Sequence, residues 1–376
     1  MNILAHIPKE LLSLVAYLSD VSSRFSLSLT SKFYVHVQHV NRYTNIDLII
    51  RDTISNDHIE LFKWLLSLSL DNKPVFSVNT TQEFCKLAAK SGSFVILRYI
   101  HDTLGLGYKN GGKLLRAAGS GGRLEIVKWI YDYYGKPEMK NWMCHGAAKN
   151  GHLDVLKWFE EKGCLFDEWI NYSAASGGHI EVLKYIRSPN KTNPIYPWNS
   201  GTSMYAAKYG HLDTLKWLRE NGCPWNEYTC AFAAYNGSFD ILKWLRSDED
   251  TCPWNERACS YAALNGHLDI LKYLRENGCP WSEDTCASAV RDGHLDVLKW
   301  LRENGCPWSE TTCAGAAGFG HFDILKWLRE NGCPWDEAAC SQAARDKHLD
   351  ILEWLHENGC PCTINNCSYC EQNRQI

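Results

Sequence analysis

Apolar residues recur at helical spacing in short segments along the chain. In one such segment Leu212, Leu215 and Leu218 stand three residues apart, and the charged residues Asp213 and Lys216 fall between them. Gly222 follows shortly after, and a glycine behind the last periodic residue is typical of a helix end. The pattern therefore predicts a short amphipathic helix.

A pair of small apolar residues, in most copies two alanines, marks a second predicted helix before each of these segments. The pairs begin at Ala88, Ala117, Ala147, Ala174, Ala206, Ala233, Ala262, Ala289, Ala316 and Ala343. The commonest spacing is 27 residues, and a degenerate first copy at residues 57–65 brings the number to about eleven. Self-similarity at such a period predicts one elongated stack of helix pairs rather than several globules.

The first helix of each pair has its own start and stop signals. A side chain able to cap the helix recurs before a glutamate at Asn226, Asn255, Ser282, Ser309 and Asp336. Such side chains accept a hydrogen bond from an unpaired backbone N–H, and glutamate favours the positive end of the helix. A Gly-His step follows the alanine pair, and we expect the histidine ring to bond a loop backbone.

The segment from Thr229 to Gly237, followed by residues 241–245, resembles the ankyrin repeat register for register. The resemblance covers about residues 50–370. It implies an all-α, ankyrin-type helical solenoid over residues 46–376, ending in a C-terminal capping helix. The family repeats about every 33 residues, so these copies are shorter. The missing residues fall between Gly222 and Ala233, where the ankyrin hairpin finger would be, and binding through projecting fingers is therefore in doubt.

Residues 1–45 do not share the repeat pattern of the rest of the chain. Pro8 suits the first turn of a helix, and Leu11 and Leu12 begin its apolar stripe. Together with the segment from Leu27 to Phe33 this resembles an F-box, although the tryptophan common near the end of that motif is absent. The resemblance implies that Pro8, Leu11 and Leu12 contact a Skp-type subunit of a cullin–RING ubiquitin ligase. The alternative is a helical cap over the apolar edge of the first repeat.

The chain contains 17 cysteines and 16 tryptophans. Many cysteines recur with six residues between them, as in Cys223 and Cys230, whereas zinc pairs usually have two to four. Cys230 falls where the ankyrin pattern has a buried leucine, so we expect reduced, buried thiols. The tryptophans of the Lys-Trp-Leu and Pro-Trp steps are expected to pack between repeats and to brace the loops.

The cysteines of the C-terminal tail are the strongest metal candidates. Four thiolates stand close together at Cys360, Cys362, Cys367 and Cys370, as in a tetrahedral zinc site. Cys360 and Cys367 are repeat positions, however, which favours core packing in the capping helix. Zinc stays the alternative, and stoichiometric metal in a chelator-treated sample would establish it.

Charge and motifs exclude several classes of function. A formal net charge of −4 offers no basic footprint for nucleic acid. No stretch approaches the roughly 20 apolar residues of a membrane helix, and Pro8, Lys9 and Glu10 interrupt a secretory signal. No phosphate loop, dinucleotide motif or catalytic constellation occurs. We therefore expect a protein of the cytoplasm or nucleus that is not an enzyme and needs no cofactor or metal.

The positions that vary between copies are the candidate recognition positions. They are the residue before the alanine pair and the two after it, which share one face of the first helix. Five aromatic residues at these positions are predicted to form the centre of a protein-binding patch: Tyr205, Tyr209, Phe232, Tyr235 and Tyr261. The alternative is that these rings only stack on one another along the groove.

These features predict a non-enzymatic protein–protein interaction module. With a working F-box it would be a substrate-recognition adaptor for a cullin–RING ubiquitin ligase, holding a target protein close to the ligase. The alternative is a plain ankyrin scaffold or competitor that binds a protein with no ubiquitin link. The short repeats rich in Cys-Pro-Trp also resemble the expanded ankyrin families of large DNA viruses of amoebae, which implies action in the host cytoplasm or nucleus.

Overall fold

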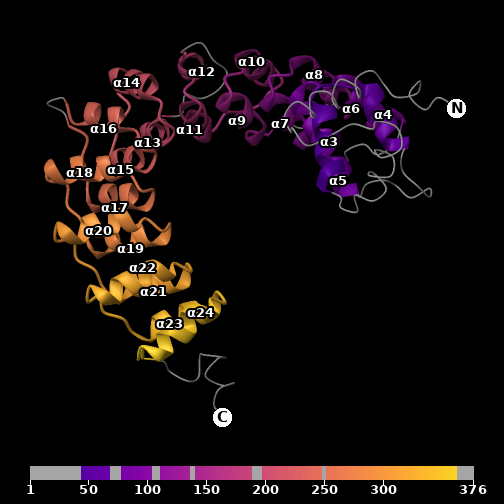
Figure 1. Cartoon of the computed structure of the whole chain (residues 1–376). Helices are drawn as coiled ribbons and strands as arrows, with labels where there is room; N and C mark the ends of the chain where they lie inside the picture. Colours follow the sequence, from indigo (N-terminus) through magenta and orange to yellow (C-terminus); the bar gives the residue numbers. More distant parts are fainter. Residues whose placement is uncertain are drawn as a thin grey trace, which may run out of the picture. The chain divides into compact units, whose positions relative to one another are not determined.

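The computed structural model describes residues 44–67, 78–103, 111–135, 140–188, 197–247 and 251–361. Within these ranges every regular element is a helix, and the helices follow one another in pairs (Figure 1). The series from α3 to α24 makes eleven pairs, the number expected from the repeats. The predicted all-α repeat architecture is therefore confirmed for the described part of the chain.

The chain forms two compact units, which are described separately. The first comprises residues 1–174 and 181–195, and the second comprises residues 175–180 and 196–376. The helices that lie wholly or mostly in the first unit are α3 (Thr44–Ser55), α4 (Ile59–Ser67), α5 (Val78–Ser91), α6 (Phe94–Arg98), the π-helical turn η2 (Tyr99–Thr103), α7 (Gly111–Ser120), α8 (Leu124–Tyr133), α9 (Trp142–Lys149), α10 (Leu153–Glu161), α11 (Trp169–Ser176) and α12 (Ile180–Ile186).

The second unit repeats the same pairing with greater regularity. Its helices are α13 (Ser200–Lys208), α14 (Leu212–Glu220), α15 (Glu227–Tyr235), α16 (Phe239–Leu245), α17 (Glu256–Leu264), α18 (Leu268–Glu276), α19 (Glu283–Arg291), α20 (Leu295–Glu303), α21 (Glu310–Gly318), α22 (Phe322–Glu330), α23 (Glu337–Arg345) and α24 (Leu349–Glu357). The odd-numbered helices pack against one another in a row, and each even-numbered helix packs against the helix before it.

Alanine allows the first helices to pack closely. Ala233 and Ala234 of α15 are fully buried, as are Ala262 and Ala263 of α17. The second helices contribute the larger apolar side chains, such as the buried Leu242 of α16. Because each helix buries only one face, the core forms only when neighbouring repeats stack.

The predicted helix starts are present as capping interactions. The Asn226 Oδ1 atom accepts a hydrogen bond of 3.2 Å from the backbone N–H of Tyr228. The Asp336 Oδ1 atom accepts one of 3.0 Å from Ala338. Ser282 forms a capping box with Thr285. These contacts fix the residue at which each first helix begins.

The Gly-His step joins each repeat to the preceding one. Gly237 has a left-handed backbone with φ of 75°, which ends α15. The His267 ring of the next repeat lies so close that a Cβ atom on Gly237 would stand 2.8 Å from its Cε1 atom. The His267 Nε2 atom also lies 3.3 Å from the carbonyl oxygen of Tyr235. The expected bond between the histidine and a backbone carbonyl is confirmed, and it crosses between repeats.

The two kinds of tryptophan contact each other. The rings of Trp225 and Trp244 meet edge to face with their centroids 5.8 Å apart. The Arg219 guanidinium lies over the other side of the Trp225 ring, 4.1 Å from its centroid. Since Arg219 belongs to α14 and Trp244 to α16, the Pro-Trp indole connects the second helices of neighbouring repeats. The same arrangement recurs at Trp281, Trp308 and Trp335.

Two expectations from the sequence fall outside the described residues. The F-box-like residues Pro8, Leu11 and Leu12 lie before residue 44, where the described part begins. The expected C-terminal capping helix lies almost wholly beyond residue 361, where it ends. None of the described residues forms a strand.

Candidate protein-binding surface

The five predicted aromatic residues lie on three successive first helices of the second unit. Tyr205 is on α13, and Tyr209 caps the end of that helix. Phe232 and Tyr235 are on α15, and Tyr261 is on α17. The alanine pair of each helix is buried against its neighbours, which leaves the positions on either side of that pair on the opposite, accessible face.

Three of these rings form a compact cluster. The Phe232 and Tyr261 centroids are 5.4 Å apart, those of Tyr235 and Tyr261 are 5.8 Å apart, and those of Phe232 and Tyr235 are 6.1 Å apart. Tyr235 meets the other two rings edge to face, at 67° and 74°, and the Phe232 and Tyr261 planes are tilted by 55°. The structure thus brings together rings from two repeats.

Lys208 connects this cluster to the preceding repeat. Its ammonium nitrogen lies 5.0 Å from the ring centroid of Phe232 and 5.9 Å from that of Tyr209. Tyr209 is 43% exposed and Tyr235 is 36% exposed, while Tyr205, Phe232 and Tyr261 are half-buried. The surface therefore has half-buried inner rings and two more exposed outer rings, those of Tyr209 and Tyr235.

The aromatic character ends within the same row of helices. On α19 the matching positions carry Arg291 and the adjacent Asp292, both exposed. An apolar ring returns at Phe319, at the end of α21, where it is 52% exposed. The aromatic patch consequently has a charged border on its C-terminal side.

The cysteine column is packed into the repeat junctions. Cys252 donates from its Sγ atom to the Asn226 carbonyl oxygen, 3.3 Å away, and Cys230 donates to the Cys252 carbonyl oxygen, 3.8 Å away. Both side chains are fully buried. A hydrogen bond with the Cys252 thiol and burial together raise the pKa of Cys230. The Cys230 thiol therefore stays protonated, and both buried side chains serve as packing groups, as the sequence predicted.

The cysteines meet in a different pairing from the one considered in the sequence. A hydrogen bond with the Cys279 thiol raises the pKa of Cys259, and one with Cys286 raises that of Cys306. Each pair joins a first helix to the loop that follows the second helix of the same repeat. The sequence analysis considered only the loop cysteine and the next first-helix cysteine, which have six residues between them, and it did not predict these contacts.

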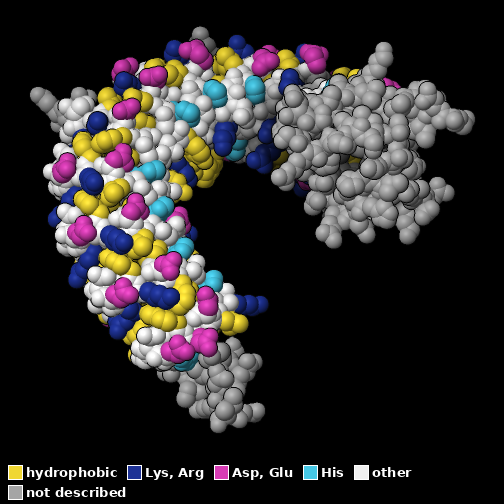
Figure 2. Space-filling view, in the orientation of Figure 1, with side chains coloured by type: hydrophobic (Ala, Val, Ile, Leu, Met, Phe, Trp, Pro, Cys, Tyr) yellow, Lys and Arg dark blue, Asp and Glu magenta, His cyan; other side chains and the backbone are white. Residues whose placement is uncertain are grey.

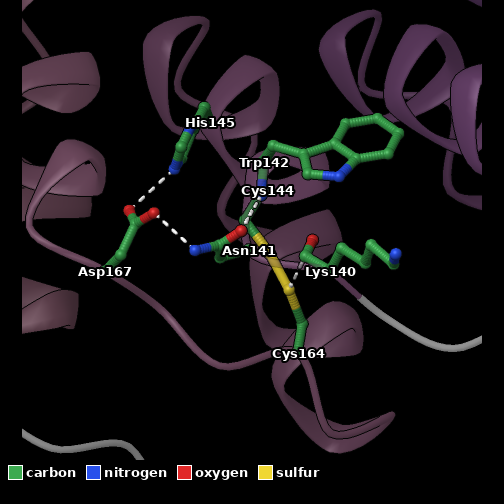
Figure 3. A network of polar contacts seen from close by, with 7 residues as sticks. All are labelled: Lys140, Asn141, Trp142, Cys144, His145, Cys164 and Asp167. Atoms are coloured by element: carbon green, nitrogen blue, oxygen red, sulfur yellow. Dashed lines mark hydrogen bonds and ion pairs between the residues drawn. A yellow bond between two sulfur atoms is a disulfide. The ribbon is translucent and has the colours of Figure 1, made fainter.

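One pair in this register, Cys144 and Cys164, is joined by a disulfide (Figure 3). The expectation of reduced thiols throughout is wrong at this pair. Cys144 lies on α9 and Cys164 follows α10, so the bond ties the first helix to the loop leading into the next repeat.

A polar network lies beside the disulfide. Asp167 accepts a hydrogen bond of 2.7 Å from Asn141 Nδ2, and its other carboxylate oxygen lies 2.7 Å from His145 Nε2. Asn141 also caps α9 by accepting from the Trp142 N–H at 2.8 Å. The Trp142 indole points away from this network (Figure 3). The His–Asp contact thus holds two repeats together and sets the position of Trp142.

The described residues contain no cluster of three or more side chains arranged to hold a metal ion. Of the four tail cysteines, only Cys360 lies within the described range, and its Sγ atom donates to the Asp336 carbonyl oxygen at 3.3 Å. Cys252 makes the equivalent contact with the Asn226 carbonyl oxygen at another repeat junction. Cys362, Cys367 and Cys370 lie outside the described residues.

Comparison with known families identifies the repeats. A family model for ankyrin repeats in three copies matches residues 203–285 and, in a second overlapping match, residues 230–312. Residues 203–312 are therefore similar to ankyrin repeats. The matched segment contains the whole aromatic patch, and the ankyrin-type helix pairs continue on either side of it. Ankyrin repeats are ordinarily binding modules for proteins and carry no catalysis.

A solved structure shows a weaker similarity. The crystal structure of the human ASB11 ankyrin repeat domain is 17% identical, with a TM-score of 0.36, over 51% of this chain and 99% of that one. No curated protein matches the sequence. In the described part of the chain, no helix is long and apolar enough to cross a membrane.

Proposed function

We propose that the chain recognises a partner protein through the aromatic patch on α13, α15 and α17. The observation that carries this proposal is the cluster of Phe232, Tyr235 and Tyr261, which presents aromatic side chains from adjacent repeats on one accessible face. Tyrosine side chains bury much apolar area at low entropic cost and still offer a hydroxyl, so they often dominate binding energy.

The stacking of these rings fits this role as well as it fits a purely structural one. Rings that already contact one another lose little conformational freedom when a partner covers them, which lowers the cost of binding. The exposed faces of Tyr209 and Tyr235 supply the contact area, and Lys208 between them adds a charge-assisted donor. A partner for this patch would present an apolar centre with an acidic or carbonyl acceptor beside it.

Two variants of the full chain test the patch. Tyr209→Ala with Tyr235→Ala removes only the exposed rings, and Phe232→Ser with Tyr261→Ser removes the rings beneath them. Leu165→Ser with Leu349→Ser is the matched control, because these leucines are 63% and 62% exposed and lie outside the patch. In quantitative affinity purification, we expect both patch variants to lose a partner that the control retains. Equal recovery by all folded variants would leave the rings with a structural role only.

The further proposal is that residues 1–45 connect this recognition module to a cullin–RING ubiquitin ligase. Its support is the F-box-like sequence, in which Pro8, Leu11 and Leu12 would contact the Skp-type subunit. The chain would then supply proximity between a target and the ligase, and the ligase would supply the chemistry. Such a role places the chain in the cytoplasm or nucleus, in the host cell if the likeness to amoebal virus families reflects its source.

Co-purification with a Skp-type subunit tests this connection. We expect the full chain to retain the subunit, and Leu11→Asp with Leu12→Asp to lose it without losing the partner bound at the aromatic patch. If the unmodified chain retains no such subunit, the plain scaffold or competitor is the correct function. The two halves of the proposal can therefore fail separately.

A further inference from the structure

The first unit contains a groove of about 660 Å³ on its own row of first helices. The helices α3, α5, α7 and α9 line it in turn. Its walls carry five cationic side chains and one aromatic ring: Arg51, Lys86, Lys90, Lys113, Arg116 and Trp142. In Figure 2, lysine and arginine side chains gather along the lower edge of α7 and α9.

Acidic side chains in this groove balance little of its positive charge. Glu83 is the only carboxylate among the lining residues, and it pairs with Lys86 at 2.6 Å. Lys90, Lys113 and Arg116 are exposed, and none of the described carboxylates lies within 4 Å of their charged groups. Arg116 instead lies over the Trp142 ring, 5.9 Å from its centroid. The formal net charge of −4 for the whole chain conceals this local excess.

The groove uses the same repeat positions as the aromatic patch. Leu87 and Lys90 stand on either side of the alanine pair of α5, and Arg116 and Ser120 do so on α7. These positions are free to vary because they do not pack in the repeat junction. Lys90 and Arg116 occupy these positions, and both side chains are exposed on the accessible face.

We propose that this groove binds an acidic peptide segment of a partner protein in extended form. Neighbouring helix axes lie about 8–10 Å apart, so four helices span about 24–30 Å. An extended chain rises about 3.3 Å per residue, so the groove accommodates roughly seven to nine residues. Alternate carboxylates of such a segment would face the cations. The residues between them would face Leu87, Ala117 and the Trp142 ring.

The lining favours a peptide over a single-stranded nucleic acid. Base recognition without sequence preference uses a series of aromatic rings on which successive bases stack, whereas this groove offers Trp142 alone among its lining residues. The apolar floor at Leu87 and Ala117 suits aliphatic side chains. Glu83, a lining residue of the groove, would repel a continuous phosphate backbone but can face a neutral residue or an amide of a peptide.

A labelled peptide tests this proposal on the full chain. The probe is a capped nine-residue peptide of alternating glutamate and leucine, and binding is followed by fluorescence anisotropy at low and moderate salt. We expect saturable binding that weakens as salt rises, and a loss of roughly tenfold or more in affinity for Lys113→Glu with Arg116→Glu. The test extends the protein-binding function to a second surface and uses no natural partner, so its failure leaves the aromatic patch untouched.

The matched control is Lys128→Glu with Lys184→Glu, which makes the same change in net charge on the second helices α8 and α12. We expect it to bind the peptide as the unmodified chain does, and the thermal midpoint of both variants shows that they fold. Failure of the peptide to bind, or equal binding by the groove variant, would overturn the proposal. Tighter binding of a nine-residue oligodeoxythymidylate, lost in the same variant, would overturn it in favour of nucleic acid.

Discussion

The ring of His267 occupies the space that a side chain on Gly237 would need. A Cβ atom added to Gly237 would stand 2.8 Å from His267 Cε1, closer than side chains normally approach. The same contact recurs between Gly266 and His294 and between Gly320 and His348. These contacts form a joint between two repeats. The glycine ends a helix of one repeat, and the histidine ring of the next repeat packs against it.

We predict that Gly237→Ala destabilises the second unit more than Gly278→Ala does. Both glycines have a left-handed backbone, but the space around Gly278 is open. Gly278→Ala should cost about 1 kcal/mol for the backbone alone, and Gly237→Ala about 1–3 kcal/mol more for the clash. Chemical denaturation measures both, and the excess should disappear when His267→Ala is added. An excess that persists without the histidine would contradict this account of the joint.

Lys347 stands where other repeats have the glycine of this joint, and it adopts a left-handed φ of 65°. We predict that Lys347→Gly raises the free energy of unfolding by about 1 kcal/mol, because glycine adopts this backbone without steric cost. Lys299→Gly, in the exposed middle of α20, should lower it by about 1 kcal/mol. Thermal or urea denaturation of the two variants tests the opposite signs, and a loss of stability in both would be inconsistent with strain at Lys347.

Arg329 combines two contacts at a repeat junction. Its guanidinium lies 3.8 Å from the Trp335 ring centroid and donates a hydrogen bond of 2.7 Å to the Cys333 carbonyl. We predict that Arg329→Ala lowers the free energy of unfolding by about 1–2 kcal/mol, and that Arg329→Lys restores only part of it because lysine lacks the planar group. Arg345→Ala, which removes an exposed pair with Asp346, should leave the unfolding midpoint unchanged. Equal effects at both arginines would refute the junction role.

The buried thiols make stability depend on alkaline pH. Burial raises the pKa of Cys85 to about 12, and hydrogen bonding and burial raise that of Cys333 still further. Since the native pKa lies above the unfolded one, the stabilisation is complete below about pH 9 and falls as the pH rises further. We expect the free energy of unfolding to decrease above this pH, and less steeply in Cys230→Ala. Thiolate absorbance from the second unit while it is still folded at pH 9 would show that these thiols are accessible.

Much of the architecture could be predicted from the sequence because the same local sequence signals recur in each repeat. The cap at Asn226, the buried pair at Ala233 and the helix stop at Gly237 are local signals with local causes, and the structure contains each of them. The sequence likewise predicted that the aromatic residues share one face of the first helices. Tyr235 and Tyr261 could be expected on one side of successive helices because the repeat length fixes their register.

Contacts between repeats were harder to predict. The pairing of Cys230 with Cys252 depends on how a first helix meets the loop after the next helix, and the sequence spacing does not reveal this contact. The basic groove was missed for another reason. Net charge averages Lys113 and Arg116 with acidic residues on other faces, so a local excess of cations does not show in the total. Arg116 stands directly before the alanine pair of its repeat, so its position carried the signal that the net charge concealed.

Site-specific photo-crosslinking tests the central claim most directly, because it asks which face of the repeats a partner contacts. A photoreactive amino acid is placed either at Tyr235, on the exposed first-helix face, or at Asp240, exposed on the second helix of the same repeat. We predict that a protein crosslinks at position 235 and that the same protein does not crosslink at position 240. Crosslinks to the same protein at position 240, with none at 235, would contradict recognition through the first-helix face.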